Sequence, residues 1–235
     1  MKAKEGIEAK RALASYLSQF ADKAQLEDLE TVLARRTRFL TVVVEDIYQS
    51  HNAAAVMRAC ECFGVQDLHV VPRRNVFRID NGSLGRGARR LTIREYAAGR
   101  KNPTEACLTS LKKQGYCIAA TTLRPGAVAI GELDLGQKLA LCFGTEEHGL
   151  SEEAHQLADR FVYLPMYGFT QSFNISVSVA LSLYECVRRL PTGSAFPMLS
   201  PEERLDLKVE WLCGLIPEGH LIAARYLREI ETGSA

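Results

Sequence analysis

Short runs of uniformly apolar residues alternate along the chain with longer segments of helical pattern. The runs lie at residues 40–44, 68–71, 116–121, 139–143 and 161–164. A strand that is apolar on both sides must be buried on both faces, as in a parallel sheet that helices cover from both sides. Cap and stop signals bound the helical segments, as at Ser50 and Gly64 or Asn102 and Gly115. The sequence therefore predicts an α/β fold, with a parallel sheet and helices on both faces.

Charged helical patterns flank this α/β region. Two helices are predicted within residues 3–35, and two more follow a linker at residues 191–200. We therefore expect an N-terminal helical extension at residues 1–35, an α/β domain at residues 36–190 and a C-terminal helical extension at residues 191–235.

Cysteine and histidine usage, together with hydropathy, limits the class of protein. The seven cysteines are scattered, mostly in apolar runs and without a Cys-x-x-Cys pair, and the five histidines show no metal-ligand spacing. We therefore expect buried, reduced thiols in a cytoplasmic protein without a metal site. The chain has no run of about 18 apolar residues and no signal-peptide pattern at its start, so we expect no membrane association.

The helix that follows the first apolar run carries two polar candidates, Asn52 near its start and Arg58 six residues later. Parallel sheets bind ligands in the loops at the carboxyl ends of their strands, where Asn52 falls. Six residues turn a helix by about 600°, which leaves the two side chains about 120° apart. They share one site only if Asn52 sits in the first turn and Arg58 reaches toward it. Otherwise they are a helix cap and an exposed arginine.

Residues 73–94 are rich in arginine and glycine. Seven arginines and one acid give this stretch an excess of six positive charges, in a chain whose net charge is +1. Guanidinium forks suit phosphate oxygens better than lysine does, so the stretch predicts contact with a polyanion such as RNA. A solvated, flexible loop is the alternative. We assign the contact to Arg73, Arg74, Arg78, Arg86, Arg89 and Arg90.

Residues 144–150 place a carboxylate between two glycines, directly after a buried strand. Gly144, Glu146 and Gly149 suggest a backbone held close to a ligand, with Glu146 binding a cationic or hydroxylated group. The dinucleotide fingerprint Gly-x-Gly-x-x-Gly is absent from the chain. A tight turn with surface acids is the alternative interpretation.

A polar loop runs into one of the most apolar helical segments of the chain, in the sequence LPMYGFTQSFNISVSVALSLYE at residues 164–185. Gly168 is expected to allow a positive φ angle. Ser172 and Asn174 come just before the helix, where backbone N–H groups lack partners. A helix cap explains one of these two polar residues but leaves the cluster unexplained.

Together these motifs resemble the SPOUT superfamily of RNA methyltransferases, and within it the TrmH (SpoU) type. The resemblance covers about residues 33–190 and rests on three elements in the right order, each after a predicted strand. They are Asn-x5-Arg at Asn52 and Arg58, Gly-x-Glu-x-x-Gly-Leu at residues 144–150, and Pro-Met-x-Gly-x3-Ser-x-Asn-x-Ser-Val at residues 165–177. The stretch LARRTRFLTVVVEDIYQSHN also looks like the tRNA (guanosine-2'-O-)-methyltransferase branch.

The resemblance implies a deep trefoil knot in the C-terminal part of the α/β domain, which is a rare exception to unknotted topology. It also implies a homodimer with the active site at the interface, and S-adenosylmethionine as the cofactor. The implied reaction is methylation of a ribose 2'-hydroxyl, with a D-loop guanosine of tRNA (position-18 type) as the expected target. Ribosomal RNA as the substrate, or a non-catalytic RNA-binding module of the same fold, are the alternatives.

Family roles can be carried over only to the residues that match its motifs. The implied catalytic residues are Asn52, Arg58, Glu146, Ser172 and Asn174. The implied cofactor contacts are Thr121, Leu123, Gly144, Glu146, Leu164, Met166, Gly168, Ser172 and Phe173. Phe173 departs from the family pattern, which has leucine there, so the shape of the pocket is expected to differ at this position.

Overall fold

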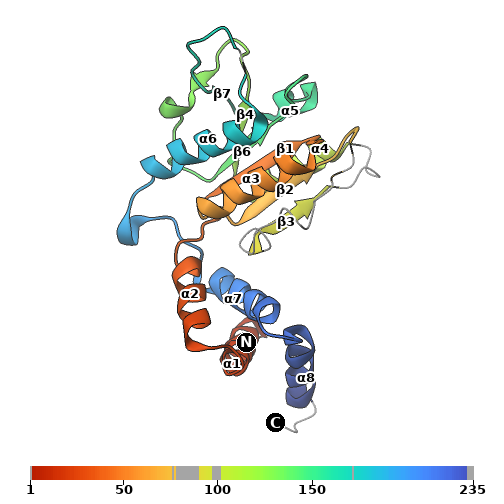
Figure 1. The fold of residues 1–235 in the computed structure, drawn as a ribbon, viewed down its shortest axis with the longest axis vertical. Coiled ribbons are helices and arrows are strands. Elements are labelled where there is room, and N and C mark those ends of the chain that lie inside the picture. The colour runs from red at the N-terminus through yellow and green to blue at the C-terminus, as the bar shows by residue number, and fades with distance from the viewer. Residues whose placement is uncertain (1, 76, 78–89, 97–101, 171, 232–235) are drawn as a thin grey trace. The chain divides into compact units, whose positions relative to one another are not determined.

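The computed structural model describes residues 2–75, 77, 90–96, 102–170 and 172–231 (Figure 1). The chain divides into two compact units. One unit is Thr37–Pro197, and the other combines Met1–Arg36 with Met198–Ala235. The segments that flank the α/β region at either end of the chain therefore fold together in one unit.

A single parallel sheet forms the centre of the unit Thr37–Pro197. In chain order its strands are β1 Leu40–Glu45, β2 Asp67–Val71, β3 Thr92–Glu95, β4 Cys117–Thr121, β5 Val128–Ala129, β6 Leu139–Phe143 and β7 Arg160–Tyr163. They lie in the order β3-β2-β1-β6-β4-β7-β5, and every pair is parallel. The central strands β1 and β6 are buried along their whole length, which confirms the predicted parallel sheet.

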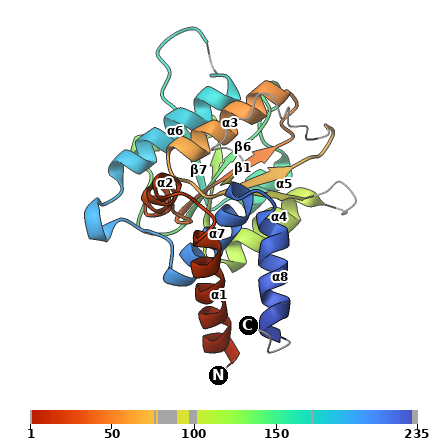
Figure 2. The same cartoon turned by 60° about the horizontal axis from the view of Figure 1, so that its bottom comes forward.

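Helices cover both faces of the sheet, as the apolar runs predicted. Helices α3 (Ser50–Cys62) and α6 (Ile175–Arg189) lie side by side on one face (Figures 1 and 2). Helices α4 (Pro103–Lys113) and α5 (Glu152–Leu157) pack together on the other. Side chains alternate along a strand, so successive residues of β1 point to opposite faces of the sheet. Val42 lies in the core under α3 and α6, and Val43 lies in the core under α4.

Local signals set most of the helix ends. Asn102 caps α4 by accepting a hydrogen bond from the Glu105 N–H at 3.1 Å, as expected. Gly64 and Gly115 follow α3 and α4 with φ angles of 73° and 82°. Ser50, the expected cap of α3, is instead its first helical residue, and Gln49 occupies the cap position.

Strands β3 and β5 were not predicted. Both lie at the edges of the sheet, where one side of a strand has no neighbour, and their side chains are only partly buried. Edge strands of two to four residues carry no continuous apolar run, so the signal that found the central strands is missing there.

The second unit is helical. It contains α1 Lys2–Ser18, α2 Lys23–Leu33, α7 Pro201–Leu215 and α8 Gly219–Glu231. Capping boxes begin two of these helices, Asp22 with Gln25 at α2 and Ser200 with Glu203 at α7. None of the helices that the structure describes, in either unit, is long and apolar enough to cross a membrane.

Candidate active site

Three of the loops that the sequence singled out meet at Glu146. The Oε1 atom of Glu146 accepts hydrogen bonds from Asn174 Nδ2 at 2.7 Å, from Asn52 Nδ2 at 3.2 Å and from the backbone N–H of Ile175 at 3.4 Å. Asn174 Nδ2 also donates to Asn52 Oδ1 at 3.0 Å. Because a carboxylate can only accept, both amide NH₂ groups turn toward Glu146, and this sets the orientation of both asparagines.

Each member of this network is placed by the element that carries it. Asn52 lies in the first turn of α3, and Glu146 follows β6. Asn174 is the N-cap of α6, where its Oδ1 accepts from the Ser176 N–H at 2.9 Å and leaves the amide nitrogen for Glu146. The network therefore ties the start of both helices on one face of the sheet to the carboxyl end of its central strand.

A tight loop holds Glu146 in place. Thr145 and Gly149 exchange backbone hydrogen bonds of 3.1 and 2.9 Å, and Gly149 has a φ angle of 64°. A Cβ atom on Gly144 would lie 2.0 Å from the carbonyl carbon of Gly149, a separation that no two non-bonded atoms tolerate. Glycine is therefore required at position 144 for the loop to close.

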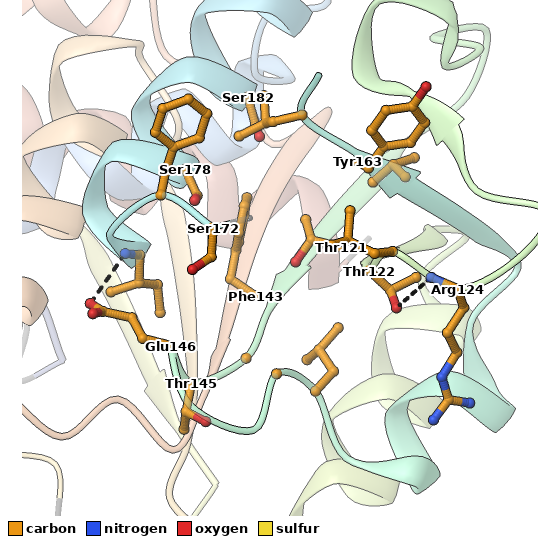
Figure 3. A pocket seen from close by; sticks show the side chains of 18 of the residues that line it. Thr121, Thr122, Arg124, Phe143, Thr145, Glu146, Tyr163, Ser172, Ser178 and Ser182 are labelled. Atoms are coloured by element: carbon orange, nitrogen blue, oxygen red, sulfur yellow. Dashed lines mark hydrogen bonds between the residues drawn. The ribbon is translucent and has the colours of Figure 1, made fainter. Parts of the chain in front are cut away.

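A cavity of about 380 Å³ lies beside this loop. The loops after β4, β6 and β7 line it together with α6 (Figure 3). These three strands are neighbours in the sheet, so the cavity opens at their carboxyl ends, where parallel sheets bind ligands. Its apolar lining includes Leu123, Leu150, Val162 and Leu164, and its polar lining includes Thr121, Thr122, Ser172, Ser178 and Ser182.

Helix α5 braces the loop after β4. The His155 ring nitrogens lie 2.8 Å from the Ser151 carbonyl oxygen and 3.2 Å from Thr122 Oγ1. Arg124 donates to both carboxylate oxygens of Glu152, at 2.5 and 3.3 Å, and this bond holds the pKa of Glu152 below its ordinary value. One wall of the cavity is thus attached to a helix rather than left as a free loop.

Ser182 supplies a buried polar atom that has no partner in the described part of the chain. The residue is 1% exposed, lines the cavity, and makes no hydrogen bond through Oγ. A buried hydroxyl without a partner costs about 1–3 kcal/mol. Its position at the cavity therefore points to a ligand with a polar atom near α6.

Most of the expected cofactor contacts line this cavity, with one exception. The lining residues are Thr121, Leu123, Gly144, Glu146, Leu164, Met166, Ser172 and Phe173. Gly168 does not line it, has open space where a Cβ atom would stand, and does not adopt a positive φ angle. The expectation of a left-handed Gly168 is therefore wrong: the backbone is ordinary there, and the neighbouring Tyr167 and Phe169 are fully exposed.

Arg58 does not join the other expected catalytic residues within the chain. It is exposed on α3 and lines a separate shallow depression with Ala55, Val177 and Leu181. It forms no ion pair with any residue that the structure describes. Asn52 and Arg58 lie about 120° apart around the helix, and the Arg58 side chain does not reach across to Asn52.

Arg73 and Arg74 differ in what they contact. The Arg73 guanidinium lies 3.5 Å from Glu45 and 3.2 Å from Glu153, so two carboxylates occupy it. Glu45 is buried and also accepts from the Ser151 N–H at 2.7 Å. Arg74 is exposed, and its guanidinium has no ion-pair partner within the described residues. Arg74 is therefore the better placed of the two for a phosphate.

Of the four other arginines assigned to RNA contact, Arg90 is the one within the described residues. Its carbonyl oxygen accepts from Gln66 Nε2 at 2.9 Å. Arg78, Arg86 and Arg89 lie outside the described residues.

A second cleft, of about 450 Å³, lies on the β1 side of the Glu146 loop and was not predicted from the sequence. Asp46, Tyr48, Gln49, Arg74 and Asn75 line it together with residues of the loop itself. The only signal in the sequence was an acidic pair that ends an apolar strand. The N–H groups that Asp46 binds lie 27 residues or more away, so no local pattern contained them.

The thiols of the chain are mostly buried. Six of the seven cysteines are buried, as expected, and only Cys62 is exposed. Burial raises the pKa of Cys107 and of Cys186 to about 12, which keeps both thiols protonated and unreactive at neutral pH. Within the described residues, no group of three or more His, Cys, Asp or Glu side chains is placed to hold a metal ion.

Comparison with known proteins agrees with the resemblance found in the sequence motifs. The SpoU rRNA Methylase family matches residues 39–184. A Borreliella burgdorferi protein named tRNA (guanosine(18)-2'-O)-methyltransferase is 38% identical over 83% of this chain and 87% of its own length. The crystal structure of the Aquifex aeolicus TrmH/SpoU tRNA modifying enzyme superposes with a TM-score of 0.71 at 30% identity, and covers 81% of this chain and 95% of that one.

A more distant structure shares the fold. The SpoU methyltransferase AviRb from Streptomyces viridochromogenes, solved in complex with the cofactor AdoMet, has a TM-score of 0.55 at 23% identity. The match covers 67% of this chain and 62% of that one.

Proposed function

This chain belongs to the SpoU rRNA Methylase family, and we propose that it uses S-adenosylmethionine to methylate the ribose 2'-hydroxyl of a D-loop guanosine in tRNA. The observation that carries the proposal is the meeting of Asn52, Glu146 and Asn174 at the edge of a cavity. These residues come from the three separate elements of the family motif. The relatives named as tRNA (guanosine(18)-2'-O)-methyltransferases favour tRNA over ribosomal RNA.

The cavity fits S-adenosylmethionine in size and chemistry. Its volume of about 380 Å³ lies in the usual range for small-molecule sites. Its apolar walls at Leu123, Val162 and Leu164 suit the adenine ring, and the unpartnered Ser182 hydroxyl suits a polar atom of the nucleoside. When bound, S-adenosylmethionine supplies a methyl group that its sulfonium sulfur already activates toward attack by oxygen.

The protein must then orient the ribose hydroxyl and help to remove its proton. We assign orientation to the Glu146 network, which holds the two asparagines, and to the exposed Ser172 at the cavity rim. Alignment of this kind can contribute several kcal/mol to the barrier. Arginine keeps its charge in proteins, so we assign Arg58 to polarising the hydroxyl together with a substrate phosphate.

The position of Arg58 supports a homodimer. Arg58 stands apart from the Glu146 network, on a surface that it shares with the exposed apolar residues Val177 and Leu181 of α6. Exposed apolar surface of this kind is typical of an interface. We propose that a second copy covers it by two-fold symmetry and receives Arg58 in its own active site.

The sheet order supports the trefoil knot that the family implies. The chain forms β4, then β6 on one side of it, and then β7 on the other, before Asn174 returns to Glu146. Mechanical unfolding from both termini tests for a knot. A knotted chain stops short of its full contour length, whereas full extension would contradict the proposal.

One assay tests the proposed function. The purified protein is incubated with labelled S-adenosylmethionine and with in vitro transcribed tRNA or ribosomal RNA, and the modified nucleotide is mapped. We expect 2'-O-methylguanosine in the D loop of tRNA. Methylation of ribosomal RNA but not of tRNA would show that ribosomal RNA is the substrate. Absence of both methyl transfer and S-adenosylmethionine binding would favour an RNA-binding module.

Ser182→Ala is expected to weaken S-adenosylmethionine binding roughly three- to tenfold, the worth of one neutral hydrogen bond. The cofactor-free protein should keep or gain stability, since the hydroxyl has no partner to lose among the described residues. Calorimetric titration and urea unfolding measure the two effects. An unchanged affinity would show that the hydroxyl does not contact the cofactor.

A further inference from the structure

We infer that the cleft between Asp46, Tyr48 and Arg74 receives the target nucleoside, and that Asp46 selects guanine by accepting hydrogen bonds from its Watson–Crick edge. This inference rests on the proposed function and names the part of the site that reads the base. The cleft adjoins the cofactor cavity, because Thr145, Glu146, His148 and Ile175 line both. A nucleoside in the cleft therefore lies next to the cofactor across the Glu146 network.

The size of the cleft suits one nucleoside. Its volume of about 450 Å³ falls in the range of small-molecule sites. A protein that reads a base in folded RNA takes it out of the stack and holds it against its own side chains. The cleft beside the cofactor cavity is the place in the described chain that meets both requirements.

Asp46 is fixed in an unusual conformation. Its φ angle is 59°, a left-handed value that few residues other than glycine, asparagine and aspartate adopt. Its Oδ1 atom accepts from three successive backbone N–H groups, those of Arg73 at 3.0 Å and of Arg74 and Asn75 at 2.8 Å each. The carboxylate is thus held rigidly, at the wall of the cleft.

The second carboxylate oxygen of Asp46 remains available. Oδ2 has no hydrogen-bond partner within the described residues, whereas Oδ1 is saturated. A carboxylate only accepts, and the guanine edge presents two donors, N1–H and the 2-amino group. Adenine presents an acceptor at N1 instead. A fixed acceptor at this position therefore favours guanine and disfavours adenine.

Other polar residues of the cleft are less suited to read the base. The Gln49 side-chain oxygen accepts from Asn52 at 3.1 Å and so belongs to the catalytic network. The Asn75 amide donates to the Asp46 carbonyl oxygen at 3.4 Å. Glu147 is a carboxylate, but its side chain is 85% exposed to solvent, which makes it a matched control for Asp46.

Two exposed side chains complete the site. Tyr48 is 72% exposed on the cleft wall, where its ring can stack on a base. The Arg74 guanidinium has no ion-pair partner in the described chain and can bind the adjoining phosphate. An aromatic surface, a fixed acceptor and a cation thus face one cleft.

Asp46→Asn provides the test. Asparagine keeps the shape, tolerates the left-handed backbone and retains Oδ1 for the three N–H groups, but it turns Oδ2 into a donor. We measure kcat/KM for wild type and variant with two tRNA transcripts, which carry guanosine or adenosine at the target position. The ratio of guanosine to adenosine rates is expected to fall roughly ten- to hundredfold in Asp46→Asn.

The rate with each transcript is compared between wild type and variant. An effect of the base change on tRNA folding is the same for both proteins, so it cancels in the comparison. Glu147→Gln is expected to keep the wild-type ratio. S-adenosylmethionine binding and Tm should be unchanged in both variants. A wild-type protein that methylates neither transcript would overturn the proposed function, whereas an active Asp46→Asn with the wild-type preference would overturn the role of Asp46.

Tyr48→Ala tests the cleft independently, because an exposed ring can be removed without harm to the fold. Its KM for the guanosine transcript should rise roughly five- to hundredfold, the usual worth of base–aromatic stacking, at an unchanged affinity for S-adenosylmethionine. If Asp46→Asn fails to fold, the KM of Tyr48→Ala decides whether the nucleoside binds in this cleft. A wild-type KM would then place the nucleoside elsewhere.

Discussion

Arg58→Ala is expected to reduce methyl transfer to tRNA by about 10²- to 10⁴-fold, the range typical of a group that assists proton removal from the reacting hydroxyl. The fold and S-adenosylmethionine binding should remain intact. Arg58 is exposed, lines neither the cofactor cavity nor the nucleoside cleft, and has no ion-pair partner among the described residues. Single-turnover assays, calorimetric titration and a thermal melt separate the three properties. Near-normal turnover would remove Arg58 from the mechanism.

A mixing experiment determines which subunit Arg58 serves. Arg58→Ala and Glu146→Ala proteins are each expected to be inactive, and are mixed under conditions that exchange subunits. If Arg58 acts on the partner's site, half of the dimers regain one of two sites, so activity returns to roughly a quarter of wild type. If Arg58 acts within its own chain, no dimer regains a complete site and the mixture stays inactive.

Subunit exchange needs its own control. Mass spectrometry of isotopically labelled and unlabelled wild-type chains, mixed in the same way, shows whether mixed dimers form. Recovered activity without mixed dimers would point to contamination, and mixed dimers without activity would contradict transfer of Arg58 between subunits.

The central sheet could be predicted because its strands are buried on both faces. Residues 40–44 and 139–143 contain almost no polar side chain, and their alternation with helical segments favours a parallel sheet covered by helices. The edge strands β3 and β5 were not predicted, because they are short and partly exposed. Cap residues such as Asn102 act over three or four residues, so the sequence contains their whole signal.

The candidate site was only partly visible in the sequence. Asn52, Glu146 and Asn174 were named because each follows a predicted strand, and the carboxyl ends of neighbouring parallel strands meet. Asp46 was missed because its role depends on a left-handed backbone and on N–H groups far along the chain. Ser182 was missed because it is one of three serines in an apolar helix, and the sequence does not show which of them is buried beside a cavity.

Gly144→Ala is expected to abolish S-adenosylmethionine binding and to lower the free energy of unfolding by about 1–3 kcal/mol, the cost of forcing extra atoms into a filled space. The new methyl group would lie 2.0–2.2 Å from the backbone of Gly149 and Leu150. Backbone cannot turn aside as a flexible side chain can. The loop must therefore open, and it carries Glu146 away from both asparagines. Urea unfolding and calorimetric titration measure the two losses.

Gly168→Ala is the matched control, since both glycines belong to the family motifs. Position 168 has open space around it and an ordinary φ angle, so stability should change by less than about 0.5 kcal/mol. Its affinity for S-adenosylmethionine should also stay at the wild-type value, because Gly168 does not line the cavity. Equal loss of binding in the two variants would show that the loop after β7 closes on the cofactor. In that case the cofactor site would extend beyond Met166 to include Gly168. Glycine would then be required at position 168 because of contact with the ligand and not because of the fold.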